Sequence, residues 1–127
     1  MSIAIIVAGG RDMTDYKRVF AALDTLSKKD RIDAIVTSGD KGCESFACAW
    51  AKIENVALFE YRPDNDDMLE HGENFGRLNN DRMLEKLREI PVEKRGVVAF
   101  PGGPWTDDIV QAAEDVAIKV WWPLGCE

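Results

Sequence analysis

The sequence has few of the residues from which disulfide frameworks and zinc sites are built. Its 127 residues include three cysteines (Cys43, Cys48 and Cys126) and one histidine, His71. The cysteines are odd in number and show no Cys-x-x-Cys spacing. A disulfide framework needs paired cysteines, and a zinc site needs clustered Cys or His ligands. We therefore expect neither of them, predict no metal and no other cofactor, and expect a reducing, cytoplasmic location.

The chain also lacks an apolar run of membrane-spanning length and an excess of basic residues. A spanning helix needs about 20 consecutive apolar residues. The apolar run at the N-terminus is shorter, follows no basic segment and ends at Gly9, so we predict a strand rather than a signal peptide. The net charge is −7. Without an apolar run of spanning length, we expect no membrane partner. An acidic chain is repelled by a phosphate backbone, so we do not expect a nucleic-acid partner either, although local N–H groups and arginines can bind a small anion.

Short apolar runs alternate with helix-length amphipathic runs along the chain. The alternation predicts right-handed βαβ crossovers, and hence an α/β, Rossmann-like three-layer sandwich with a central, mainly parallel five-stranded sheet. A single domain is expected over residues 1–127. The polar, acidic segment 62–74 is predicted to be either a surface connection or a lid over a ligand. The predicted strands are 3–8, 32–37, 56–61, 96–100 and 118–122, and the last two predicted helices are 75–89 and 106–116.

Three glycine-rich turns, at 9–12, 38–44 and 101–106, each follow a predicted strand. If the strand order is 3-2-1-4-5, it reverses between strands 1 and 4, and ligands bind beyond the carboxyl ends of strands at such a point. Bare backbone N–H groups and a helix N-terminus at this rim would attract an anion, phosphate above all. The predicted ligand-binding residues are Gly9, Gly10, Arg11, Asp12, Gly39, Lys41, Gly42, Asn80, Arg82, Pro101, Gly102, Gly103, Thr106 and Asp107.

Several of these residues also have a structural explanation. Thr106 can cap a helix, and Arg11 and Asp12 can pair with each other. An acidic residue such as Glu44 in a first helical turn complements the helix dipole. Cys43 is interpreted as a small buried residue, because no histidine stands near it in the sequence to activate a thiolate.

The turns, taken in order, resemble the SLOG superfamily, most closely its cpYpsA-related, YspA-like branch. The similar segments are 9–16, 39–51, 76–84 and 99–108. The resemblance implies a Rossmann-like fold that binds nucleotides or nucleotide-derived ligands. The wider superfamily includes the lonely-guy phosphoribohydrolases, which cut the N-glycosidic bond of nucleoside monophosphates. Their pattern Pro-Gly-Gly-x-Gly-Thr-x-x-Glu is changed here, with Trp105 in place of a glycine and Ile109 in place of the glutamate.

Three functions fit these residues. The first is the sensing or sequestering of a nucleotide-type ligand by the glycine-rich loops. The second is an N-glycosidase acting on nucleoside monophosphates, with Asp108 or Glu44 as the carboxylate and Arg82 on the phosphate, because carboxylates assist cleavage through an oxocarbenium-like state. The third is an interaction protein that uses the acidic segment and Trp121–Trp122. The chain is also compatible with a homodimer.

Overall fold

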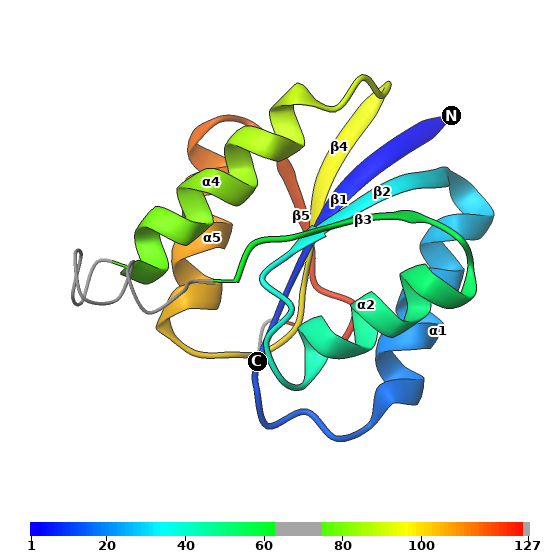
Figure 1. The fold of residues 1–127 in the computed structure, drawn as a ribbon, viewed down its shortest axis with the longest axis horizontal. Helices are drawn as coiled ribbons and strands as arrows, with labels where there is room; N and C mark the ends of the chain where they lie inside the picture. The colour runs from blue at the N-terminus through cyan, green and yellow to red at the C-terminus, as the bar shows by residue number, and fades with distance from the viewer. Residues whose placement is uncertain (63–74, 126–127) are drawn as a thin grey trace.

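The computed structural model describes residues 1–62 and 75–125, and these residues form a sheet of parallel strands with helices on both sides (Figure 1). The sheet has five strands in the order β3-β2-β1-β4-β5. The predicted fold class and the predicted reversal between β1 and β4 are confirmed. The strands are β1 (Ser2–Ala8), β2 (Arg31–Thr37), β3 (Ala57–Glu60), β4 (Lys94–Ala99) and β5 (Lys119–Trp121). The helices are α1 (Tyr16–Lys29), α2 (Cys43–Ile53), α4 (Phe75–Glu89) and α5 (Pro104–Asp115).

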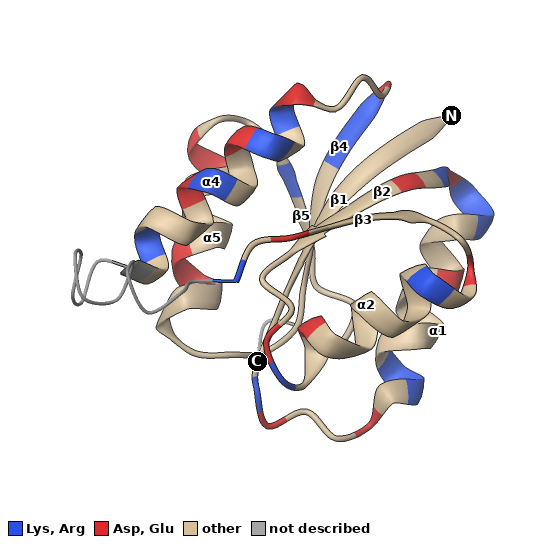
Figure 2. Ribbon diagram, viewed as in Figure 1, with Lys and Arg blue, Asp and Glu red and all other residues tan. Residues whose placement is uncertain are grey.

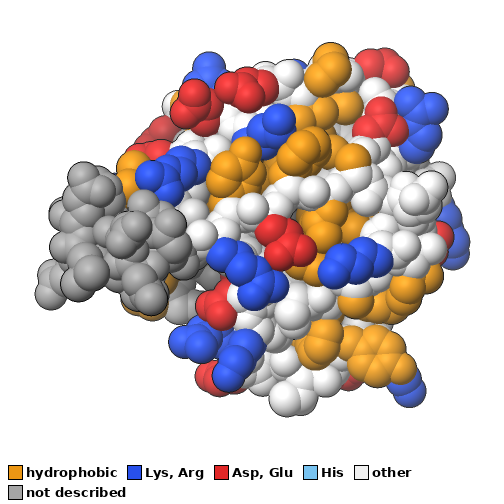
Figure 3. Space-filling model, in the orientation of Figure 1, with side chains coloured by type: hydrophobic (Ala, Val, Ile, Leu, Met, Phe, Trp, Pro, Cys, Tyr) orange, Lys and Arg blue, Asp and Glu red, His pale blue; other side chains and the backbone are white. Residues whose placement is uncertain are grey.

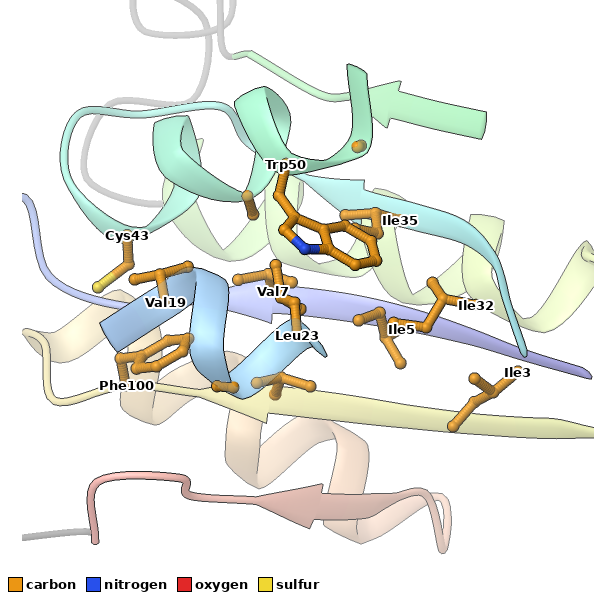
Figure 4. Close-up of a cluster of buried hydrophobic side chains, with 14 residues drawn as sticks. Ile3, Ile5, Val7, Val19, Leu23, Ile32, Ile35, Cys43, Trp50 and Phe100 are labelled. Atoms are coloured by element: carbon orange, nitrogen blue, oxygen red, sulfur yellow. The ribbon is translucent and has the colours of Figure 1, made fainter. Parts of the chain in front are cut away.

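Each face of the sheet has its own hydrophobic core. Helices α1 and α2 cover one face, and α4 and α5 cover the other (Figure 1). Alternate residues of β1 enter the two cores: Ile5 and Val7 pack under α1 and α2 (Figure 4), whereas Ile6 packs under α4 and α5. A strand buried on both faces requires a continuous apolar run, which explains the sequence of β1. No helix among the described residues is long and apolar enough to cross a membrane.

One detail of the helices differs from the prediction. Helix α5 begins at Pro104, not at Thr106, and Gly103 is its N-cap residue. Proline suits the first helical position because the N–H that it lacks has no partner within the helix there. At the end of α2, Ile53 is 70% exposed. It lies two positions, or about 200° of helical turn, beyond the fully buried Ala51, so it points away from the sheet.

Candidate functional site

The loops that follow β1, β2 and β4 interlock at the carboxyl rim of the sheet. The N–H of Gly10 donates to the carbonyl of Pro101 at 3.0 Å, and the N–H of Cys43 donates to the carbonyl of Gly10 at 3.3 Å. Gly42 has φ +79°, and a Cβ built on it would lie 2.3 Å from the Gly10 carbonyl oxygen. The three turns therefore lie together, as the strand order predicted. Two N–H groups that were expected to be bare are engaged: that of Gly10 by the contact between the turns, and that of Gly39, within its own turn, by the Thr37 hydroxyl at 3.4 Å.

The start of α5 offers fewer donors than the sequence suggested. The N–H groups of Thr106 and Asp107 both donate to the carbonyl of Gly103, and Pro104 has no N–H. Among the described residues, the N–H groups of Gly102 and Gly103 have no hydrogen-bond partner. At the start of α5, the backbone N–H groups that can attract an anion are therefore those of these two glycines.

Beside the interlocked loops lies a cleft of about 540 Å³. This volume falls within the range of about 300–1,000 Å³ that is typical of small-molecule sites. Ala8 lines its floor. One side, which we call the charged wall, is formed by Gly9, Gly10, Arg11, Ser38, Gly39, Asp40, Glu44 and Arg62. The other side, the uncharged wall, is formed by Gly76, Asn79, Asn80, Met83, Gly103, Pro104, Trp105, Thr106 and Ile109.

About half of the residues predicted for the site line this cleft. Those that line it are Gly9, Gly10, Arg11, Gly39, Glu44, Asn80, Gly103 and Thr106. Those that do not are Asp12, Lys41, Gly42, Arg82, Pro101, Gly102, Asp107 and Asp108. Two of the latter, Gly42 and Gly102, are used for packing, because a Cβ on either would collide with a neighbouring loop or helix. The roles assigned to all these residues remain predictions.

Each arginine of the charged wall faces a carboxylate. Arg11 Nε lies 3.3 Å from Asp40 Oδ2, so its partner is Asp40 and not the adjacent Asp12 that the sequence suggested. Arg62 Nε lies 3.1 Å from Glu60 Oε2. Loop packing brings the ends of β1 and β2 together, and Arg11 therefore pairs with Asp40, distant in sequence, instead of the adjacent Asp12.

Glu44 projects from the first turn of α2 into the charged wall. Its Oε1 accepts hydrogen bonds from the Thr37 hydroxyl at 3.1 Å, from the Ser38 N–H at 3.1 Å and from the Ser38 hydroxyl. Its Oε2 has no hydrogen-bond partner among the described residues. Burial raises the pKa of the Glu44 carboxyl, and the bonds from Ser38 and Thr37 oppose that shift. Oε2 can therefore accept a hydrogen bond from a ligand or, when protonated, donate one.

Asp108 and Arg82 differ from Glu44, because neither lines the cleft. Asp108 accepts from Asn80 Nδ2 at 3.0 Å and pairs with Arg77 Nε at 3.3 Å. These contacts hold the start of α5 against α4. Of the three residues predicted for catalysis, Glu44 alone lines the cleft.

The cysteine at the start of α2 is a packing residue, as the sequence indicated. Cys43 is fully buried, and burial raises the pKa of its thiol to about 11. A thiol with this pKa stays protonated at neutral pH and is a poor nucleophile. Within residues 1–62 and 75–125, no group of three or more His, Cys, Asp and Glu side chains is arranged to hold a metal ion.

Trp105 is the largest side chain of the uncharged wall. A Cβ on Gly76 would lie 2.4 Å from the indole, so the ring rests directly on the backbone of the first turn of α4. Its backbone carbonyl accepts from Asn80 Nδ2 at 3.0 Å, and the residue is 43% exposed. Ile109 also lines this wall, at the place where the lonely-guy pattern has glutamate.

The predicted site omitted some lining residues that the sequence could have indicated. Arg62 follows the end of β3, so the rule that ligands bind beyond strand ends applies to it as well. Gly76 is a poor helix former in the first turn of a helix, and such a glycine often marks a close approach. Nothing local identifies Asn79 or Met83, because α4 positions them by tertiary packing.

The comparisons with known proteins agree with the resemblance seen in the sequence. The model of the YspA, cpYpsA-related SLOG family matches residues 3–67, which is just over half of the chain. The matched range contains every residue of the charged wall, whereas the uncharged wall lies beyond it. No curated protein and no solved structure matches the chain.

Proposed function

Because the chain belongs to the YspA, cpYpsA-related SLOG family, we propose that it binds a nucleotide or a nucleotide-derived ligand in the cleft, and thereby senses or sequesters it. Membership of this family fits a nucleotide-related binding role or a glycosidase-like role. The observation that carries the proposal is a pair of features at one end of α5. The N–H of Gly103, in the cleft lining, and that of the adjacent Gly102 have no partner among the described residues, and they lie close in sequence to the indole of Trp105, which also lines the cleft.

These two features suit the two ends of a nucleotide. Consecutive backbone N–H groups at a helix N-terminus bind phosphate oxygens, and the helix dipole favours the negative charge. An exposed indole gives a flat surface on which any base can stack. Across the cleft, Glu44 Oε2 can accept a hydrogen bond from a ribose hydroxyl or a base amino group.

The substitution Gly103→Asp tests the proposal. Gly103 has φ −100° and ψ −160°, a conformation open to any residue, and a Cβ there meets no atom within 4 Å. An added carboxylate should therefore repel phosphate without straining the backbone. We expect the melting temperature to be kept and the affinity for nucleoside monophosphates to fall by about tenfold or more, as measured by calorimetry.

Gly103→Asn is the matched control, because it adds nearly the same volume without the charge and should keep most of the affinity. The ligand panel should contain nucleosides, nucleotides and ADP-ribose derivatives. The proposal fails if no member of the panel stabilises the protein at millimolar concentration, or if Gly103→Asp binds phosphate-bearing members as tightly as the unchanged chain does.

Glu44 favours a second candidate, an N-glycosidase acting on nucleoside monophosphates. A carboxyl whose pKa is raised by burial can act as a general acid. Glu44 would protonate the departing base as the C1′–N bond breaks; water would then add to C1′ and return a proton to the carboxylate. Chromatography should detect free base released from a nucleoside monophosphate, and Glu44→Gln should abolish the release while binding persists. The absence of release from all the common monophosphates would exclude this candidate.

A further inference from the structure

Two neighbouring asparagines of α4, Asn79 and Asn80, line the cleft although each is only 5% exposed. A buried carboxamide needs partners for its nitrogen and its oxygen, because an unmade hydrogen bond is costly there. Both nitrogens have partners. Asn79 Nδ2 donates to the Tyr61 carbonyl, and Asn80 Nδ2 donates to the Trp105 carbonyl and to Asp108 Oδ2, each at 3.0 Å. These oxygen partners identify the nitrogen end of each carboxamide, because an amide oxygen could not pair with them.

The oxygen end of Asn80 is the part that remains for a ligand. Its nitrogen already serves two acceptors, and its Oδ1 has no hydrogen-bond partner among the described residues. In the part of the chain that the structure describes, no side-chain nitrogen or oxygen is both sealed from solvent and without a partner. Asn80 Oδ1 therefore keeps access to solvent, and the cleft is the opening that this residue lines. The uncharged wall thus presents a hydrogen-bond acceptor that is fixed in place by its own amide nitrogen.

The carboxamide of Asn80 lies beside the indole of Trp105. The Trp105 carbonyl accepts from Asn80, and the ring rests on Gly76, which precedes Asn80 by four residues in α4. Residues four apart share one face of a helix, so the ring and the carboxamide lie along the same side of α4. A base stacked on the indole would therefore turn an edge toward Asn80. Stacking accepts any base, whereas the donors and acceptors on the edge differ from base to base.

Charge does not distinguish one neutral base from another in this cleft. In the loops after β1 and β2, basic and acidic residues lie next to each other, whereas the loop between β4 and α5 carries no charge (Figure 2). On the face shown in Figure 3, basic and acidic side chains of the described residues are interspersed. Discrimination among bases then depends on hydrogen bonds at the base edge, where Asn80 Oδ1 offers an acceptor.

We infer that Asn80 selects the base, so that the cleft prefers a base with an exocyclic amino group (adenine, cytosine or guanine) over hypoxanthine or uracil. The inference rests on the proposed function and specifies its ligand. An amino group donates to Asn80 Oδ1. A carbonyl in the same place would set two acceptors against each other and leave both unpaired, and a site built around a hydrogen bond rejects a ligand that cannot make it.

Calorimetric titration of the full chain with matched nucleosides tests this choice. Adenosine, purine riboside and inosine carry an amino group, a hydrogen and a carbonyl at C6; cytidine and uridine carry an amino group and a carbonyl at C4; guanosine has an amino group at C2 that inosine lacks. The titrations are repeated with the 5′-monophosphates, whose phosphate contributes equally within a set.

In each set of which a member binds, we expect the amino member to bind about tenfold more tightly than its counterpart without the amino group, with purine riboside between adenosine and inosine. A counterpart that binds as tightly as the amino member would overturn the inference and leave the proposed function standing. Binding by no nucleoside and no monophosphate would overturn both.

Asn80→Ala removes the acceptor, so the ratio of amino to carbonyl affinity should fall about fivefold or more, toward one. Asp108→Ala is the matched control. It breaks one contact of the same carboxamide but leaves Oδ1 and the bond to the Trp105 carbonyl, and Asp108 does not line the cleft. Looser packing of α5 on α4 would weaken both members of a pair alike, so the ratio separates recognition from structure.

A ratio that persists in Asn80→Ala, or that falls equally in Asp108→Ala, would contradict the inference. If Asn80→Ala does not fold, the nucleoside series on the unchanged chain still decides the question.

Discussion

The two walls of the cleft are built by different means. The charged wall consists of strand ends and the start of α2, locked to one another by backbone contacts such as the bond from the Cys43 N–H to the Gly10 carbonyl. The uncharged wall consists of side chains from two helices, with Trp105 resting on Gly76. The shape of the first wall is therefore set by loop packing at glycines, whereas the shape of the second is set by the size and chemistry of individual side chains.

The difference divides the site into a scaffold held by loop packing and a part shaped by individual side chains. The family match at residues 3–67 contains the charged wall, with its paired arginines and Glu44. The uncharged wall, outside that range, carries the aromatic surface, Trp105, and the glycine with room for a side chain, Gly103. Substitutions of the glycines that pack the loops of the charged wall should mainly change stability, and substitutions in the uncharged wall should mainly change ligand affinity.

The largest effect is expected for Gly42→Ala, in the loop between β2 and α2 that packs behind the charged wall. The residue has φ +79°, and its new Cβ would lie 2.3 Å from the Gly10 carbonyl oxygen and 2.8 Å from that of Arg11. Both are backbone atoms of a packed loop, so strain and collision add. We expect the free energy of unfolding to fall by about 3 kcal/mol or more in urea denaturation.

Gly103→Ala is the counterpart in the uncharged wall. Its backbone conformation is unstrained and its Cβ meets open space. The free energy of unfolding should change by less than about 0.5 kcal/mol. Equal losses of unfolding free energy in Gly42→Ala and Gly103→Ala would contradict the distinction between a glycine required by packing and one that faces the cleft.

Trp105→Ala should produce the next largest effect, this time on affinity. Stacking of a base on an aromatic side chain contributes about 1–3 kcal/mol, so the ligand should bind about 5- to 150-fold more weakly. The free energy of unfolding should change less than it does for a core residue, because Trp105 is 43% exposed. Trp121→Ala, on β5 and with 39% exposure, is the control that should leave affinity unchanged. Unaltered binding in Trp105→Ala would show that the ring fills space without touching the ligand.

The fold could be predicted because its signals are local and repeated. A strand buried on both faces must be apolar throughout, and a helix on a sheet must be apolar on one side, so the patterns of β1 and α1 indicate the layers without tertiary information. The strand order then follows from one topological hypothesis. That order places the three glycine-rich loops at one rim of the sheet, where they contact one another.

The use of each glycine could not be predicted, because it depends on atoms distant in sequence. A glycine at position 42 indicates freedom of backbone conformation. The reason that a glycine is needed there is the close approach of the Gly10 carbonyl, which belongs to another loop. Likewise, Arg11 has an adjacent carboxylate, Asp12, yet pairs with Asp40 across the rim. A turn motif indicates where a site lies; which of its groups remain available is decided by the packing of neighbouring loops.

The last effect concerns Glu44, a charged-wall residue whose carboxyl faces the cleft. Burial raises the pKa of this carboxyl above its ordinary value of 4.5. At a pH between 4.5 and the raised pKa, the folded chain therefore holds a proton that the unfolded chain has lost. The unfolded state then binds fewer protons, and stability falls as the pH rises through this window. Glu44→Gln removes the titration, so the unchanged chain should lose free energy of unfolding relative to the variant from pH 4.5 upwards, by at most about 1.4 kcal/mol per pH unit.

Urea denaturation of both proteins from pH 4 to pH 8 measures this difference, which should grow with pH and level off above the raised pKa. Ser38→Ala sharpens the measurement. It removes a hydroxyl donor that opposes the shift, so the window should extend to higher pH. A difference that stays flat, or that shrinks as the pH rises, would mean that the hydrogen bonds from Ser38 and Thr37 outweigh burial. Glu44 would then be a fixed anion of the scaffold, unable to exchange a proton with a ligand.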